Sequence, residues 1–301
     1  MFDLGSIVSS KQLYQPQRFM LYGVQGIGKS LAASTFLAPI VLRTEDGFGA
    51  IDVPTFPQVA ESYDDVISAI NALHGDHDFK SFVIDSIDWL EPLVWQQVCN
   101  LHPDNNGIPI ANIEKIGYGR GYIEADMFWR ELLEGLDSLR HQKGMQIVAI
   151  AHSEVKTFTP PDDDAYDRYQ PKLHKRAFAL WQEWCDQVFF INYERRMINR
   201  DKEGTQKRAE GEGLRSVYTQ ERPAFLAKNR WNIPSKIMIG QDKTWKALHD
   251  ALKASIGPKY PYPYQQQPQN QGQGQPQNQM QYQNQYQDQY QPQNQNQRRL
   301  V

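Results

Sequence analysis

Apolar and polar positions follow two alternating periods along the first two thirds of the chain. Short apolar runs between polar turns predict buried strands, and apolar residues three or four positions apart predict helices. The predicted strands are Arg18–Tyr22, Ile40–Arg43, Ser81–Asp85 and Gln146–Ala151. The predicted helices are Ser30–Phe36, Tyr63–Leu73, Trp89–Leu101 and Phe128–Arg140. Strands that alternate with helices predict an α/β fold whose mostly parallel sheet carries helices on both faces.

The pattern changes after Asp186, where apolar segments follow one another without helices between them. These segments are Val188–Tyr193, Gly213–Tyr218 and Ala224–Lys228. We expect them to form an antiparallel extension at one edge of the sheet, followed by a closing helix at Thr244–Ile256.

The composition changes sharply at Gly257, after which Gln, Asn, Pro, Gly and Tyr dominate. Such a segment has almost no aliphatic side chains to bury, so it cannot offset the entropy cost of ordering. We therefore expect one folded domain over residues 1–257 and a disordered tail over residues 258–301. Tyr282, Tyr286 and Tyr290 recur every four residues in the tail, which can serve as a plain spacer or as a contact segment for a partner.

Charge and cysteine content exclude several classes of protein. The net charge is -3, which is unlike the strongly basic surface of a dedicated duplex-DNA binder. No apolar run is long enough to span a bilayer and no secretory signal is evident, so we expect no membrane contact and a cytoplasmic location. Cys99 and Cys185 lie too far apart for a zinc motif and are expected to be buried thiols.

A phosphate-binding motif follows the first predicted strand. Residues 23–30 match G-x-x-x-x-G-K-[ST], the loop whose backbone N–H groups wrap the phosphates of a nucleotide. In this motif Lys29 reaches the β- and γ-phosphates and Ser30 binds Mg²⁺, so ATP and Mg²⁺ are expected. The expected nucleotide-binding residues are Gly23, Val24, Gln25, Gly26, Ile27, Gly28, Lys29 and Ser30.

Carboxylates at the ends of neighbouring strands complete the predicted site. Asp85 ends a buried strand and is expected to help hold Mg²⁺, although it could instead cap the next helix. Ser86 follows it where many P-loop ATPases place the glutamate that activates water. Glu45 is therefore the expected general base, with Asp88 as the weaker alternative. The alternative interpretation is that Glu45 belongs only to a polar turn.

His152 ends the predicted strand Gln146–Ala151 and is a candidate sensor of the γ-phosphate. A single histidine at a strand end can equally be a satisfied surface group.

These motifs resemble the RecA-like class of P-loop ATPases, and more narrowly the AAA-family nucleotide-binding proteins of bacteriophages, which include RecA-like single-strand annealing proteins. The likeness covers Phe19 to Pro234, and His152 stands where RecA itself has Gln. Besides the phosphate-binding loop, it is carried by Thr44–Gly47, Asp52–Pro54, Val83–Leu90, Gly117–Tyr122, Ala151–Ser153, Lys172–Lys175 and Glu183–Asp186.

The resemblance implies a RecA-like core and ATP hydrolysis in an oligomer of identical subunits. It also implies that Lys228 and Arg230 form a Lys-x-Arg element that enters the nucleotide site of a neighbouring subunit. A phage-encoded protein of this kind would work in the cytoplasm of the host cell.

Two segments combine basic and aromatic residues, which suits single-stranded DNA because rings stack on bases while cations meet phosphates. Solvated flexible loops are the alternative. The first, Asn106–Tyr122, carries Lys115, Tyr118, Arg120 and Tyr122. The second, Ser153–Arg176, carries Lys156, Phe158, Tyr166, Arg168, Tyr169, Lys172, Lys175 and Arg176, but also Asp162, Asp163, Asp164 and Asp167.

The sequence thus predicts a DNA-stimulated ATPase that acts on single-stranded DNA in phage recombination, annealing or replication. The alternative is a non-catalytic ATP-dependent switch that recruits a single-strand binding protein or another replication protein. A small-molecule kinase is a weaker alternative, because no arginine-rich lid is evident.

Overall fold

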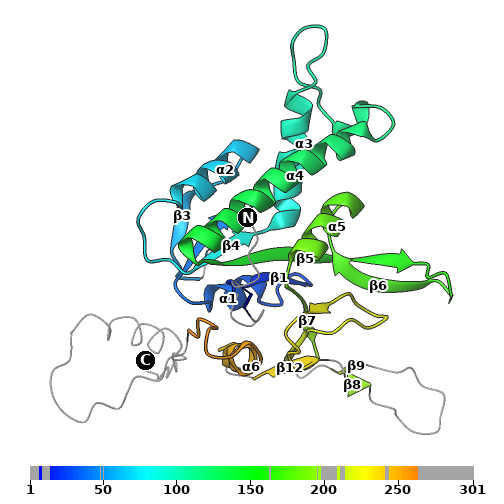
Figure 1. Ribbon diagram of the computed structural model, residues 1–301. Helices are drawn as coiled ribbons and strands as arrows, with labels where there is room; N and C mark the ends of the chain where they lie inside the picture. Colours follow the sequence, from blue (N-terminus) through cyan, green and yellow to red (C-terminus); the bar gives the residue numbers. More distant parts are fainter. Residues whose placement is uncertain are drawn as a thin grey trace, which may run out of the picture. The chain divides into compact units, whose positions relative to one another are not determined.

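A mostly parallel sheet forms the centre of the computed structural model (Figure 1), which describes residues 7–8, 14–47, 49, 51–162, 164–194, 196–197, 209–210, 214–240 and 244–263. The strand order is β12-β10-β7-β1-β5-β4-β2-β3, and the six strands from β7 to β3 run parallel to one another. The six are β7 (Gln187–Tyr193), β1 (Arg18–Gly23), β5 (Gln146–Phe158), β4 (Ser81–Asp85), β2 (Pro39–Arg43) and β3 (Thr55–Val59).

Helices cover both faces of the sheet (Figure 1). One apolar cluster joins the first face to α2, α3, α4 and α5, and a second joins the other face to α1 and α6. Along β1, Met20 and Tyr22 belong to the first cluster, whereas Phe19 and Leu21 belong to the second. The helices are α1 (Lys29–Ser34), α2 (Tyr63–Ala72), α3 (Ile87–Asn100), α4 (Arg120–Ser138), α5 (Lys175–Trp184) and α6 (Lys246–Ile256). A 3-10 turn η3 (Ile113–Lys115) precedes α4, and a π-helical turn η4 (Leu139–Lys143) follows it.

The predicted fold class is confirmed: the sheet is α/β with an antiparallel extension at one edge. The extension consists of β10 (Arg215–Tyr218) and β12 (Lys236–Ile239), with the short β11 (Lys228–Asn229) paired to β7. The segment Val188–Tyr193, predicted as part of the antiparallel group, joins the two parts of the sheet, because β7 pairs in parallel with β1 and antiparallel with β10 and β11. A small separate sheet pairs β8 (Arg196–Met197) with β9 (Ala209–Glu210).

Helix α4 begins at Arg120, well before the predicted start at Phe128. Its first turns bury the small residues Gly121 and Ala125, which the hydrophobic pattern of the sequence does not mark as a buried helix face. A Cβ atom at Gly121 would lie 2.5 Å from the Cγ1 atom of Ile113, so the helix passes too close to η3 for any larger residue. The first candidate DNA segment therefore ends inside a helix.

The second candidate DNA segment is in large part a β-hairpin. Strand β5 continues beyond Ala151 to Phe158 and pairs with β6 (Tyr166–Pro171), so that Ser153 lies opposite Pro171 and Phe158 opposite Tyr166. The hairpin projects from the sheet (Figure 1).

The packed part of the chain continues past residue 257, where the sequence predicts the domain boundary. Tyr260 is 2% exposed, and its hydroxyl oxygen lies 2.7 Å from Nδ1 of the buried His249. The remainder of the predicted tail, from residue 264 onward and including its three spaced tyrosines, lies outside the described residues.

Both cysteines are buried free thiols, as predicted. Among the described helices none combines the length and the apolar character that a membrane crossing requires.

Candidate nucleotide site

The predicted site residues lie at the edge of the sheet where the parallel strands end. Gly23 at the end of β1 is in register with His152 on β5, and Asp85 at the end of β4 is in register with Arg43 on β2. The loop Gly23–Ser30 leaves this edge and enters α1 through Gly28, whose φ of 99° is the left-handed conformation that favours glycine.

Lys29 lies folded back over the loop. Its Nζ donates hydrogen bonds to the carbonyl oxygens of Gly23 and Val24, both at 3.2 Å. Burial lowers the pKa of Lys29, and the nearby carboxylates of Asp85, Asp88 and Glu45 work against this shift. The ammonium group is therefore held at the loop, on the side that faces these carboxylates.

Ser30 and Asp85 form the closest polar contact of the site. The Ser30 hydroxyl donates to Oδ2 of Asp85 at 2.6 Å, and Asp85 is only 4% exposed. Burial raises the pKa of Asp85 to about 6, the hydrogen bond from Ser30 lowers it, and Glu45 raises it further. A hydroxyl and a carboxylate oxygen in contact are a donor set that suits Mg²⁺. These two residues therefore fit the predicted metal role.

Glu45 is fixed by residues whose role the sequence does not reveal. The Ser86 hydroxyl donates to Oε1 of Glu45 at 3.0 Å. Thr44 in turn holds the backbone of Ser86, because its Oγ1 donates to the Ser86 carbonyl and accepts from the Ser86 N–H, both at 2.7 Å. Ser86 thus positions the carboxylate that the sequence offers as the general base. The sequence held one clue to this role, because Ser86 stands where many P-loop ATPases have a glutamate.

Both carboxylate oxygens of Asp88, the alternative base, contact His152. Its Oδ1 accepts the backbone N–H of His152 at 2.9 Å, and its Oδ2 lies 3.0 Å from Nδ1 of the same residue. Burial raises the pKa of Asp88, but the hydrogen bonds from His152 outweigh it and hold the pKa below its usual value. The Asp88 side chain is 2% exposed and that of Glu45 is 23% exposed, so water reaches Glu45 more readily.

His152 connects this cluster to the hairpin. Its Nδ1 lies 3.9 Å from Oε1 of Glu45 as well as 3.0 Å from Asp88. The residues that follow it on β5, from Ser153 to Phe158, form the first strand of the hairpin.

Lys228 and Arg230 lie at the opposite end of the sheet from the nucleotide site of their own chain, so their expected role in a neighbour's site stays a prediction. Lys228 pairs with Val188 at the beginning of β7, and its Nζ donates to the carbonyl oxygens of three residues at the end of α5. Arg230 pairs with Asp186 at 3.2 Å. The three carbonyl oxygens belong to Gln182, Glu183 and Cys185, at 2.6, 3.0 and 2.7 Å. These contacts give Lys228 a helix-capping role within its own chain.

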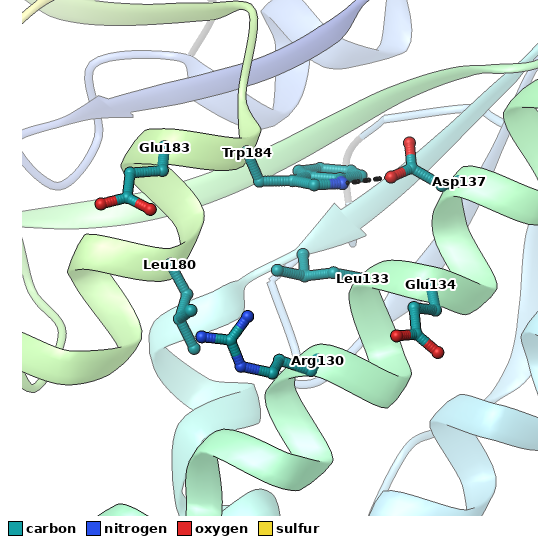
Figure 2. Close-up of a pocket in the computed structure, with 7 residues that line it drawn as sticks. All are labelled: Arg130, Leu133, Glu134, Asp137, Leu180, Glu183 and Trp184. Carbon is teal, nitrogen blue, oxygen red and sulfur yellow. Dashed lines mark hydrogen bonds between the residues drawn. The ribbon is translucent and has the colours of Figure 1, made fainter.

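A groove of about 330 Å³ lies between α4 and α5, near the same end of the sheet (Figure 2). The indole N–H of Trp184 donates to Oδ2 of Asp137 at 2.8 Å, and Asp137 also pairs with Arg18 at the start of β1. No residue predicted for nucleotide binding lines this groove. Its lining consists of Arg130, Leu133, Glu134, Asp137, Leu180, Glu183 and Trp184.

The two candidate DNA segments meet through aromatic rings. Tyr122 stacks on His174 with ring centroids 4.2 Å apart, and both rings contact Trp95. Several basic residues in these segments already have acidic partners: Lys156 pairs with Glu154, Arg168 with Glu221 and Arg176 with Asp126.

Comparison with known proteins identifies the family. A family model described as an AAA domain matches residues 15–231. No curated protein matches the chain. Among solved structures, the crystal structure of the RadB recombinase is similar, with 13% identity, a TM-score of 0.39, and coverage of 75% of this chain and 89% of that chain. Because the family model spans well over half of the sequence, this chain belongs to the AAA domain family.

Proposed function

We propose that the chain binds ATP with Mg²⁺ at the Gly23–Ser30 loop and hydrolyses it. The observation that carries this proposal is the contact between Ser30 and the buried Asp85 at 2.6 Å, with Glu45 beside it. In P-loop NTPases the serine or threonine of the loop and an aspartate at a strand end together hold Mg²⁺. Ser30 and Asp85 match this pair.

The residues of the chain have separate tasks in this reaction. The backbone N–H groups of the loop and the ammonium of Lys29 bind the phosphates. Ser30 and Asp85 would hold Mg²⁺, which neutralises charge on the β- and γ-phosphates when bound. Glu45 accepts a proton from the attacking water while the water oxygen bonds to the γ-phosphorus. The bond from that phosphorus to the bridging oxygen then breaks, giving ADP and phosphate.

Positioning of Glu45 falls to Ser86, whose hydroxyl donates to the carboxylate and thereby fixes its direction. His152 is the candidate sensor, since it is close to Glu45 and starts the segment that becomes the hairpin. A change in the hydrogen bonding of Glu45 on ATP binding would reach the hairpin through this residue.

Single-stranded DNA is the ligand that we propose for the surface formed by the two meeting segments. Tyr118 is fully exposed and has a left-handed φ of 55° between two glycines that also have positive φ, so its ring is presented to solvent. Lys172 and Lys175 are exposed on the segment that carries His174, the stacking partner of Tyr122. An exposed ring on one segment and exposed lysines on the segment that it meets suit stacking on a base together with contact to phosphates.

The proposal extends to an assembly of identical subunits that acts in recombination, annealing or replication. Lys228 and Arg230 remain the residues proposed to enter a neighbour's nucleotide site. In the single chain Lys228 donates to three carbonyl oxygens at the end of α5, so it would have to leave these contacts to reach a neighbour.

Mg²⁺-dependent ATP hydrolysis by the full chain, with and without single-stranded DNA, tests this function. We expect hydrolysis to rise with DNA, and Tyr118→Ala combined with Lys172→Ala and Lys175→Ala to remove the rise. The matched control is Lys246→Ala with Lys253→Ala, which removes one exposed and one partly buried cation from α6 on the other face. ATP binding without hydrolysis would favour the non-catalytic switch, and equal stimulation of both variants would exclude this DNA surface.

A further inference from the structure

Arg215 reaches the phosphate-binding loop from the antiparallel extension, although it lies almost two hundred residues further along the chain. It begins β10 and is in register with Tyr193 on β7, two residues beyond Ile191, which is level with Gly23. Arg215 alternates with Ser216 and so shares a face with Val217, which packs in the same apolar cluster as α1. Arg215 is therefore placed at the nucleotide edge, on the α1 face.

The guanidinium group of Arg215 lies directly against Gly28. A Cβ atom at Gly28 would be 3.0 Å from Nη1 of Arg215 and 3.5 Å from its Cζ. A Cβ at position 28 would crowd the guanidinium, in addition to the strain of its left-handed backbone. From the same edge of the sheet, the Tyr193 hydroxyl lies 3.5 Å from the Gly26 carbonyl oxygen.

Two side chains beside Gly28 carry buried hydrogen-bond donors without acceptors. Among the described residues, neither Nε nor Nη1 of Arg215 has a hydrogen-bond partner, although both atoms are buried. The same holds for the indole nitrogen of Trp245, whose ring atom Cζ2 would lie 3.4 Å from a Cβ at Gly28. That nitrogen and Cζ2 are bonded to a common ring carbon, so it too lies close to Gly28.

Donors of this kind require an acceptor. A guanidinium group remains charged at any physiological pH, and a buried donor left unsatisfied destabilises the protein. Two carbonyl oxygens of the loop, those of Gly23 and Val24, already accept hydrogen bonds from Lys29. An anion is the acceptor that a guanidinium binds most strongly, and phosphate oxygens fit its fork of N–H groups.

We propose that Arg215 binds the phosphate chain of the nucleotide held at Gly23–Ser30, and that it does so within its own chain. This inference rests on the proposed nucleotide site. This cation belongs to the same subunit and is distinct from Lys228 and Arg230, which the sequence analysis assigned to a neighbour's site. The acidic residues Asp85 and Glu45 then approach the nucleotide from the β4 and β2 side, and Arg215 from the β7 and β10 side.

The test compares Arg215→Met, which keeps the length of the side chain without its charge, with Arg215→Lys and wild type. Affinities for ATP and ADP with Mg²⁺ are measured by calorimetry, and melting temperatures are measured with and without ATP. We expect Arg215→Met to bind ATP about 10- to 100-fold more weakly, the usual effect of losing a hydrogen bond to a charged group. Arg215→Lys should fall between Arg215→Met and wild type.

The melting temperature separates a binding role from a structural one. Because Arg215→Met removes two buried donors that have no acceptor among the described residues, the nucleotide-free protein should melt no lower than wild type. Its stabilisation by ATP should shrink. The control is Lys236→Met on β12, which removes a cation paired with Glu194 and should leave ATP affinity within about twofold.

Two results would overturn the assignment: wild-type affinity in Arg215→Met, or a lower melting temperature without ATP together with unchanged stabilisation by ATP. Lys29→Ala in the same titration separates this failure from failure of the site. If Lys29→Ala weakens binding and Arg215→Met does not, only Arg215 is wrongly assigned. If wild type itself binds no ATP, the proposed nucleotide site fails.

Discussion

The two ends of the parallel sheet both gather charged residues, but they combine them differently. At the amino end, Arg18 pairs with Asp186 at 2.9 Å and with Asp137 at 3.3 Å, and Arg230 adds a second cation to Asp186. Burial raises the pKa of Asp186, but Arg18 outweighs it, so the pKa lies below its usual value. At the carboxyl end, burial raises the pKa of Asp85 to about 6.

This difference separates charges that hold the fold from charges that await a ligand. At the amino end Asp137 and Asp186 each pair with a cation, and the ammonium of Lys228 is shared by three carbonyl oxygens. At the carboxyl end, carboxylates collect beside one another, and two buried donors of Arg215 have no acceptor among the described residues. Such an incomplete arrangement is unfavourable for folding alone and is typical of functional sites.

Removing Lys29 should have the largest effect and tests whether the carboxyl end is a nucleotide site at all. We expect Lys29→Ala to lower ATP hydrolysis on the order of 100- to 1,000-fold, because the phosphates lose a preorganised cation. Steady-state phosphate release measures this loss. An equal loss of ATP hydrolysis in the control Lys246→Ala, which removes an exposed lysine, would contradict the assignment of the carboxyl end as the nucleotide site.

Removing one carboxylate from each end should change stability in different directions. Asp186→Ala should lower the free energy of unfolding by about 3 kcal/mol, because the buried Arg18 loses the closer of its two carboxylate partners and keeps only Asp137. Asp85→Asn should leave the nucleotide-free protein as stable as wild type or more so, since a carboxylate with a raised pKa loses an unfavourable charge. Urea unfolding measures both changes. Equal losses for the two variants would contradict the distinction between the ends.

The smallest expected effect belongs to Lys228→Ala. It removes a cap from the end of α5 and should cost about 1 kcal/mol of stability, with ATP hydrolysis within about twofold of wild type. Chemical unfolding and phosphate release check the two parts. A large loss of hydrolysis in a folded Lys228→Ala protein would instead support the prediction that this residue supplies a cation to a neighbour's site.

The sequence was most informative where chemistry and chain order coincide. The loop Gly23–Ser30 follows a strand and precedes a helix, and Asp85 ends a second strand, so parallel pairing brings Ser30 and Asp85 to one edge. Periodicity also located most central strands and the helices that cover them. These features are predictable because each lies in a short segment of sequence, and the fold class determines which of these segments lie side by side.

The rest depended on long-range placement. Lys228 and Arg230 form a recognisable pattern, but only the register of β11 with β7 shows that they lie at the amino end. Arg215 belongs to no motif, and its approach to Gly28 follows from the pairing of β10 with β7. Small residues concealed the start of α4, because Gly121 is buried by close approach to Ile113 and not by apolar character.

The central claim, that Glu45 activates water at the carboxyl end of the sheet, is tested most directly by ATP turnover of Glu45→Gln. The neighbouring Asp46→Asn is the matched control, since the Asp46 side chain is 92% exposed. We expect Glu45→Gln to bind ATP with wild-type affinity and to lower kcat by about 100-fold or more, with Asp46→Asn close to wild type. Wild-type turnover by Glu45→Gln, in a preparation where Lys29→Ala is inactive, would contradict the account.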